Sequence, residues 1–270
     1  MPQRYPVALF LVFLAIFSAP AAANLVFSAP PRETQSGGAD SYAPLAEYLS
    51  KVTGQKVDYR YSDNWLSYQK EMQKGTYDLV FDGPHFVGWR MAKLGHVPLV
   101  KFPGNLSFVV IVKQADTRFN SIQQLAGRTI CAHAPPNLAT LTVLYEFKNP
   151  ARQPMIINTQ GFAAAYKDVV SGKCVAAILQ TKMAAELDKE AHATRVVYQS
   201  EPLPNQALSA GPRIPPEMQQ KIYRALLSDE GRTAAAPLLE RFKMKEFVPA
   251  SSKEYLGLGV LLQDVRGFDR

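Results

Sequence analysis

Strand-like and helix-like segments alternate along the first third of the chain, and this alternation most constrains the fold. Short apolar runs predict strands, and between them apolar residues recur at the three- and four-residue spacing of one helix face. The expected strands are 25–27, 57–61, 77–81 and 97–102, and the expected helices are 42–52, 64–74 and 85–94. This β-α-β-α-β-α-β order is typical of a mostly parallel sheet with helices on both faces.

A second alternating series begins after a β-branched run at 107–112. Its expected strands are 129–133, 155–157, 174–179 and 194–198, and its expected helices are 137–147, 161–171 and 181–191. An apolar run at 207–214 and helices at 216–227 and 231–242 complete the pattern. The chain has 270 residues, of which 47% are hydrophobic, so it is long enough for two modest domains. The sequence therefore predicts two α/β domains with mixed, mostly parallel sheets.

The amino terminus carries the pattern of an export signal. Arg4 precedes an apolar run at 7–17, and Ala21-Ala22-Ala23 provides the small residues of a cleavage site. The run is too short to span a bilayer, which takes roughly 20 apolar residues. We therefore expect a signal peptide at 1–23 and a mature, exported chain from Asn24. Removal of Arg4 lowers the formal net charge from +7 to +6.

Charge and motifs exclude several classes of function. The basic residues are dispersed rather than clustered with aromatics, which argues against nucleic-acid binding. The chain has no phosphate-binding G-x-x-x-x-G-K-[ST], no dinucleotide-binding G-x-G-x-x-G, no H-E-x-x-H and no G-x-S-x-G. No nucleophile and base stand at a recognisable spacing, so we expect neither a cofactor nor an enzyme.

Two cysteines, Cys131 and Cys174, each lie in a short strand-like run. In an oxidising compartment such a pair favours a structural disulfide. The alternatives are two buried thiols or one catalytic cysteine.

Polar residues gather where the expected strands end and the expected helices begin. Two α/β domains without a cofactor motif indicate a hinged binding protein, which takes its ligand between the domains at these strand ends. The candidate ligand-binding residues are Tyr42, Asp82, Gly83, His85, His133, Asn137, Thr140, Gln160 and Gln180. The glycine permits close approach of the backbone, and the following helix start offers free N–H groups.

Several segments resemble one family of transport proteins. They are Leu25–Pro30, Tyr42–Leu49, Gly54–Val57, Gly75–Pro84, Leu125–Ile130 and Val169–Ala177. In their order and spacing they look like the phosphate/phosphite/phosphonate-type solute-binding proteins of ABC transporters. The resemblance implies a type II periplasmic binding fold with two lobes, two crossover segments and closure around a solute. It also implies a periplasmic location and delivery to an inner-membrane permease driven by a cytoplasmic ATPase, and it assigns Tyr42 to the ligand. We expect the protein to be a monomer.

The resemblance places the crossovers near 103–112 and 201–208. Lobe one is then 24–107 plus 206–270, and lobe two is 108–205. The hydroxyl-rich turn of phosphonate binders is replaced here by Pro135–Thr140, which is nearly stripped of hydroxyls. Gln160 and Gln180 stand where the family carries Ser-His and an acidic residue. The resemblance therefore supports the family's fold and transport role for this chain more strongly than it supports the family's ligand.

The leading hypothesis is capture of a small solute, with a phosphorus oxyanion or organophosphonate favoured. Asp82 would repel such an anion unless it is protonated or paired. One alternative is therefore a metal or metal chelate held across the cleft by Asp82, His85 and His133. Another is a sensory module that signals to a membrane receptor instead of a permease.

Overall fold

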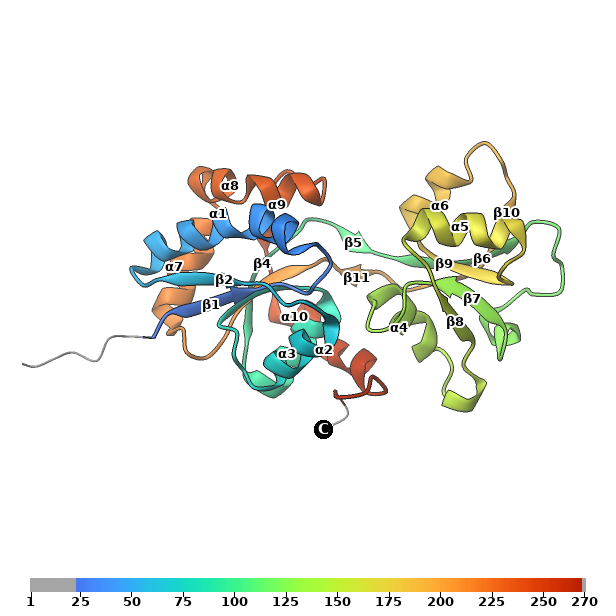
Figure 1. Cartoon of the computed structure of the whole chain (residues 1–270), viewed down its shortest axis with the longest axis horizontal. Helices are drawn as coiled ribbons and strands as arrows, with labels where there is room; N and C mark the ends of the chain where they lie inside the picture. Colours follow the sequence, from blue (N-terminus) through green and yellow to red (C-terminus); the bar gives the residue numbers. More distant parts are fainter. Residues whose placement is uncertain (1–22, 269–270) are drawn as a thin grey trace, which may run out of the picture.

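The computed structural model describes residues 23–268, which form two lobes joined by two extended segments (Figure 1). Each lobe is built on one sheet, and we call them lobe one (the six-stranded sheet) and lobe two (the five-stranded sheet). The mixed α/β fold class is confirmed. The signal-peptide prediction falls on residues outside the described part, apart from Ala23, and the exact lobe boundaries stay a prediction. Within residues 23–268, no helix has the length and apolar character needed to cross a membrane.

The sheet of lobe one has the order β13-β4-β12-β3-β1-β2. Its strands are β1 (Leu25–Ser28), β2 (Val57–Arg60), β3 (Leu79–Asp82), β4 (Val97–Lys101), β12 (Ala207–Ala210) and β13 (Val248–Pro249). β1 pairs in parallel with both β2 and β3, whereas β12 runs antiparallel between β3 and β4. A strand from late in the chain thus completes a sheet begun by the first strands, which requires the chain to return from lobe two.

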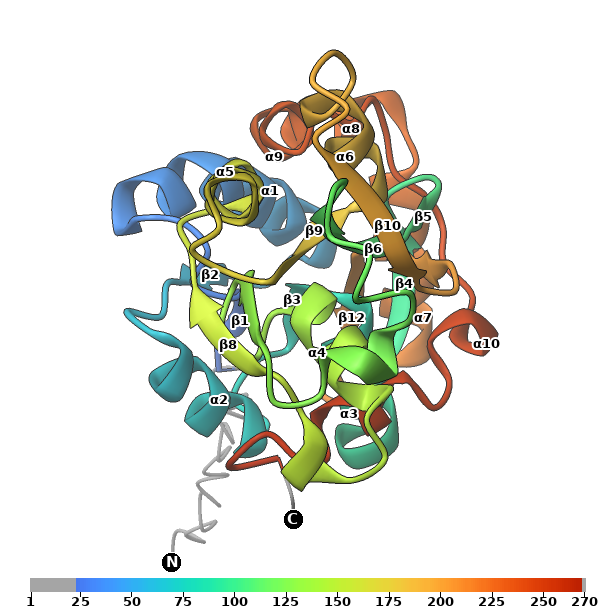
Figure 2. The same cartoon turned by 90° about the vertical axis from the view of Figure 1, so that its right-hand side faces the viewer.

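Helices cover both faces of this sheet (Figures 1 and 2). They are α1 (Gln35–Thr53), α2 (Trp65–Gln73), α3 (Pro84–Leu94), α7 (Pro216–Leu226), α8 (Asp229–Ala234), α9 (Ala236–Arg241) and α10 (Ser252–Tyr255). Alternate strand residues face opposite cores: Phe27 and Phe81 join one buried cluster, and Val26 and Val80 join another. Thr34 accepts a hydrogen bond at the start of α1, and Gly54 ends that helix in the left-handed conformation.

Lobe two has the strand order β10-β6-β9-β7-β8. Its strands are β6 (Phe108–Lys113), β7 (Thr129–Ala132), β8 (Met155–Asn158), β9 (Ala176–Gln180) and β10 (Thr194–Gln199). Its helices are α4 (Leu138–Tyr145), α5 (Phe162–Ser171) and α6 (Thr181–Leu187), with short turns η1 (Ile122–Leu125) and η2 (Pro150–Arg152). The Cys131–Cys174 disulfide is present, with the two Cα atoms 5.7 Å apart, so the predicted structural disulfide is confirmed. In the chain-entropy description, closing this loop stabilises the fold by about 4 kcal/mol.

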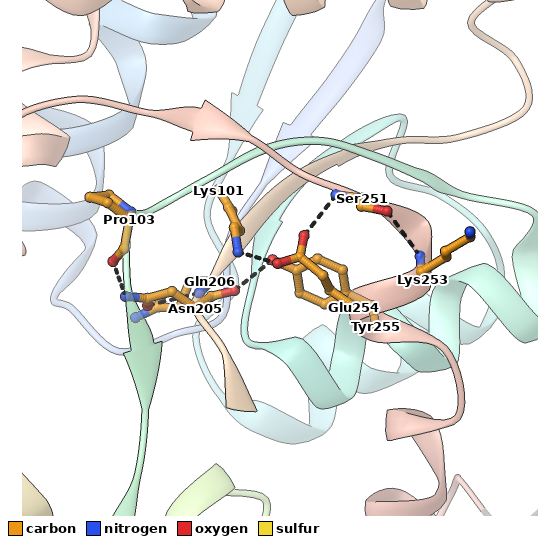
Figure 3. Close-up of polar contacts among 8 residues, drawn as sticks. All are labelled: Lys101, Pro103, Asn205, Gln206, Ser251, Lys253, Glu254 and Tyr255. Atoms are coloured by element: carbon orange, nitrogen blue, oxygen red, sulfur yellow. Dashed lines mark hydrogen bonds and ion pairs between the residues drawn. The ribbon is translucent and has the colours of Figure 1, made fainter. Parts of the chain in front are cut away.

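The crossover segments form a two-stranded ribbon between the lobes. β5 (Asn105–Leu106) pairs antiparallel with β11 (Leu203–Pro204). Figure 3 shows how lobe one holds the ends of this ribbon. The Tyr255 hydroxyl donates to the Asn205 carbonyl at 2.8 Å, and the Asn205 side-chain amide donates to the Pro103 carbonyl at 3.1 Å. Nearby, Lys101 pairs with Glu254.

The structure corrects the expected helix at 231–242. That stretch forms two short helices, α8 and α9, which meet at Ala235. The break precedes Pro237, whose nitrogen cannot donate the hydrogen bond that would continue one helix. The chain also adds β13, α10 and the turn η3 (Leu258–Leu262) in a region where the sequence predicted no element.

Candidate functional site

A cavity of about 280 Å³ lies between the lobes, beside the crossover ribbon. Its polar lining comes from Arg32, His85, Asn137, Gln180, Asn205 and Gln206. Its aromatic lining comes from Trp65, Phe86, Phe108, Phe162 and Phe242, and its aliphatic lining includes Leu106, Leu138 and Met244. Because both lobes and both crossovers contribute, closing or opening the hinge changes the cavity directly. We call this space the inter-lobe cavity.

Arg32 is the one cationic side chain among these lining residues. It follows β1 and precedes the start of α1. Its Nη1 donates to Oε1 of Gln206 at 2.8 Å, on the segment that follows β11. Within residues 23–268, no acidic side chain lies at ion-pair distance from its guanidinium, whereas the neighbouring Glu33 pairs with Arg241. Arg32 is thus positioned by a neutral partner and keeps its charge for a ligand.

His85 joins the lobes at the edge of the cavity. It lies in the first turn of α3, and its Nε2 is 3.0 Å from the carbonyl oxygen of Pro136 in lobe two. Burial lowers the pKa of His85 from 6.5 to about 3, so the ring is neutral near pH 7. A carbonyl oxygen only accepts, so Nε2 carries the proton and Nδ1 is an acceptor. Nδ1 is buried and has no hydrogen-bond partner in the described part of the chain.

Gly83, which caps the start of α3, lies next to both the imidazole of His85 and the guanidinium of Arg32. A Cβ atom built on Gly83 would lie 3.2 Å from Nδ1 of His85 and 3.7 Å from Nη2 of Arg32. Only glycine leaves this gap open. The helix start after Gly83 has no side-chain cap, so its N–H groups are not satisfied by a side chain.

Four of the nine predicted ligand-binding residues line the inter-lobe cavity: Gly83, His85, Asn137 and Gln180. The Asn137 side chain also accepts a hydrogen bond from the Ala139 N–H, so it caps α4 at the same time. Gln180 ends β9 and precedes α6. Their contact with a ligand stays a prediction.

The other five predicted residues do not line the cavity. Tyr42 is fully buried against Phe27 and Tyr59, and its hydroxyl has no hydrogen-bond partner among residues 23–268. Thr140 is buried and donates to the His133 carbonyl at 2.5 Å. His133 packs on Phe162, and Gln160 is exposed before α5. In this conformation none of these four side chains belongs to the cavity lining, and their contact with a ligand stays a prediction.

Asp82 lies in the core of lobe one rather than in the cavity. Its carboxylate accepts from Arg90 Nε and from the Tyr68 hydroxyl, each at 2.6 Å, and both Asp82 and Arg90 are fully buried. The paired carboxylate does not oppose an anion in the cavity. It is committed to these two partners, and residues 23–268 contain no group of three or more His, Cys, Asp or Glu side chains that could hold a metal. In this conformation Asp82, His85 and His133 are therefore not brought together, and the metal alternative stays a prediction.

Sequence reasoning missed Arg32, Asn205, Gln206 and the aromatic lining. Arg32 had a usable signal, because it follows the first strand at the same sheet edge as Gly83. The aromatic residues had none, because phenylalanines at helix starts and after α9 look like ordinary core residues in the sequence.

Comparison with known proteins agrees with this architecture. The family described as "ABC transporter, phosphonate, periplasmic substrate-binding protein" matches residues 27–255. The phosphate-import protein PhnD of Mycolicibacterium smegmatis is 28% identical over 116 residues, a match that covers 40% of this chain and 36% of that protein. This chain thus spans about a third of the length of that curated relative.

Two solved structures share the fold at low sequence identity. XAC2383 from Xanthomonas citri, bound to ATP, superposes with a TM-score of 0.70 at 15% identity, covering 91% of this chain and 99% of that one. PhnD1 from Prochlorococcus marinus, in complex with methylphosphonate, has a TM-score of 0.64 at 15% identity, covering 90% and 98%. The type II two-lobed fold expected from the sequence is confirmed.

Proposed function

The chain belongs to the family of periplasmic substrate-binding proteins of phosphonate ABC transporters, and from this premise we propose that it captures a phosphorus oxyanion or organophosphonate in the inter-lobe cavity. One observation carries the proposal: Arg32 extends into a cavity between hinged lobes without an acidic partner in the described chain. A guanidinium in that position offers a charge-assisted, bidentate contact to an oxyanion. The relatives add weight, since one is named for phosphate import and another holds methylphosphonate.

The proposal includes export and a membrane partner. The signal peptide at 1–23 would direct the chain to the periplasm, and the loaded, closed form would dock on a permease. Among the lining residues of the cavity we find no pair of nucleophile and base, which favours binding without turnover. The side chains of Asn137 and Gln180 are uncharged, so they would hold the solute through hydrogen bonds, which favours reversible binding.

Thermal unfolding of solute-free protein tests the proposal. Phosphate, phosphite and methylphosphonate form one panel, and sulfate and divalent metals form the other. Ligand at 100 times its Kd stabilises a protein by about 2.7 kcal/mol, and each kcal/mol raises the midpoint by roughly 2–4 °C at this size. We expect a shift with at least one phosphorus compound and none with the metals.

The Arg32→Gln variant identifies the site. It should weaken binding about 10- to 100-fold, because a charge-assisted hydrogen bond contributes about 1.5–3 kcal/mol. Arg118→Gln is the matched control, since Arg118 is an exposed arginine paired with Asp116 and lies outside the cavity lining. A shift with metals alone, or equal weakening by both variants, would contradict the proposal.

A further inference from the structure

The charges around the inter-lobe cavity limit the charge of its solute. Arg32 and His85 are the only titratable side chains among the residues that line it, and His85 is neutral near pH 7. The lining therefore supplies one full positive charge, supplemented by the partial charge at the uncapped start of α3. A second full negative charge on the solute would have no matching cation, and an uncompensated charge is costly in an apolar cavity. A cationic group on the solute would meet no carboxylate among these lining residues.

The walls of the cavity are apolar on both sides of the cleft. Lobe one contributes Phe86 and Phe242, and lobe two contributes Phe108, Leu138 and Phe162. Phe86, Phe108 and Leu138 are also packed into their own lobes, which holds them in place. A solute as small as phosphate would leave the apolar side chains of these walls without a packing contact. A solute with an apolar substituent would be clamped between them when the lobes close.

His85 adds a requirement for a hydrogen-bond donor. Its Nε2 is committed to the Pro136 carbonyl, and its buried Nδ1 accepts from nothing among residues 23–268. Nδ1 and Nη2 of Arg32 flank the same point above Gly83. A head group held there by Arg32 through a charged oxygen can satisfy Nδ1 only with an O–H.

We propose that the solute is a singly charged, hydrogen-bearing phosphonate with an apolar substituent, its head group held between Arg32 and His85 and its substituent packed against the aromatic side chains of both lobes. This inference rests on the proposed function, because it presupposes a phosphorus oxyanion. It deepens that function by selecting one class of phosphonate. The half-buried His133 packs on Phe162 of the aromatic wall, so its own titration has to be separated from that of the solute.

Calorimetric titration of solute-free protein with four matched probes tests the inference. Phenylphosphonate carries both features, and methylphosphonate lacks the apolar ring. Phenylphosphonate monomethyl ester and benzenesulfonate keep the ring and a single charge but lack the acidic O–H. We expect phenylphosphonate to bind at least about tenfold more tightly than each of the other three.

The pH profile and one variant separate the two features. The second proton of a phosphate monoester leaves near pH 6, and a phosphonate holds it slightly longer, so phenylphosphonate should bind more tightly at about pH 5.5 than at about pH 8. The methyl ester and the sulfonate should show no such change, which excludes titration of His133 as its cause. Phe162→Ala should weaken phenylphosphonate by a larger factor than it weakens methylphosphonate, whereas Tyr145→Ala, outside the cavity lining, should change neither.

The outcomes distinguish a failure of this inference from a failure of the proposed function. Methylphosphonate binding as tightly as phenylphosphonate, or the methyl ester binding as tightly as the parent acid, overturns this inference and leaves the proposed function intact. No binding of any phosphonate, together with no shift with phosphate or phosphite, overturns both.

Discussion

At the scale of single residues, Asp82 shows how pairing changes the role of a side chain. The sequence places it at the end of a strand, where it resembles a ligand contact. The structure surrounds its carboxylate with Arg90 and Tyr68, all fully buried. A buried ion pair stabilises a fold only while both members are present, because removing one leaves the other charge uncompensated.

Asp82→Asn should therefore lower the free energy of unfolding by about 3–5 kcal/mol. Urea unfolding followed by circular dichroism measures this loss. Asp58→Asn is the control, since Asp58 forms an exposed pair with Lys56 and its loss should leave the free energy of unfolding nearly unchanged. Equal, small losses in both variants would show that Asp82 is not buried with Arg90 in solution.

Two buried histidines predict a loss of stability in mild acid. Burial lowers the pKa values of His85 and His96 to about 3, whereas an unfolded histidine titrates near 6.5. Below pH 6.5 these histidines are therefore protonated in the unfolded chain but stay neutral in the native state. Stability is complete above pH 6.5 and falls as pH drops toward 3, by about 2 kcal/mol per histidine at pH 5.

Urea unfolding at pH 7 and at pH 5 tests this dependence, and His96→Gln should reduce the difference between the two. The carboxyl groups with lowered pKa values, such as Asp116, act in a different window, because their unfolded values lie near 4. An identical loss in the variant would assign the acid sensitivity to other groups.

The residues of the site were predictable only where backbone position decides their role. Gly83, Asn137 and Gln180 line the cavity because strand ends and helix starts lie at its edge, and the sequence marks those points. Thr140 also lies in the first turn of its helix, and Tyr42 lies inside α1, which begins at Gln35 and not at Tyr42 as expected, yet both side chains are buried in the lobes. The rotation of a helix about its axis is set by packing across the whole lobe, which one local pattern does not contain.

At the scale of elements, the carboxyl-terminal segment seals one face of lobe one through a close contact between backbones. A Cβ on Gly88 of α3 would lie 2.6 Å from the Tyr255 carbonyl oxygen and 2.8 Å from the Gly259 nitrogen. The turn η3 packs against α3 by this contact, and its Leu261 also packs on the core of lobe two. The sequence did not predict η3, because its glycine-rich stretch has neither helical nor strand periodicity.

Gly88→Ala should destabilise the protein by about 1–3 kcal/mol, although alanine is the better helix former, because the added methyl group meets backbone atoms. Gly37→Ala in α1 is the matched control, since its Cβ would contact only side-chain atoms, the nearest at 3.3 Å. That variant should be neutral or slightly stabilising. Denaturation midpoints compare the two, and a neutral Gly88→Ala would show that η3 is not held against α3.

At the scale of the whole molecule, function depends on coupling between lobes that have separate cores. The described conformation already joins them through the β5–β11 ribbon, the His85–Pro136 hydrogen bond, and the packing of Leu261 and Leu141 on the core of the opposite lobe. A solute in the inter-lobe cavity adds a further connection, because its lining comes from both lobes. A ligand shifts a conformational equilibrium only by its difference in affinity for the two states, and contact with both lobes is available only when they are closed.

Small-angle X-ray scattering should therefore record a smaller radius of gyration when the solute binds, approaching the roughly 18 Å of a compact chain of this length. Phenylphosphonate is the probe, and Arg32→Gln at the same concentration should remain at the larger, solute-free value. Raising the concentration for the variant until it saturates should restore closure, because the apolar walls that the solute bridges are intact. Heat of binding without any change in the radius would mean that the cavity is a fixed pocket, and closure would then not be the signal that a permease reads.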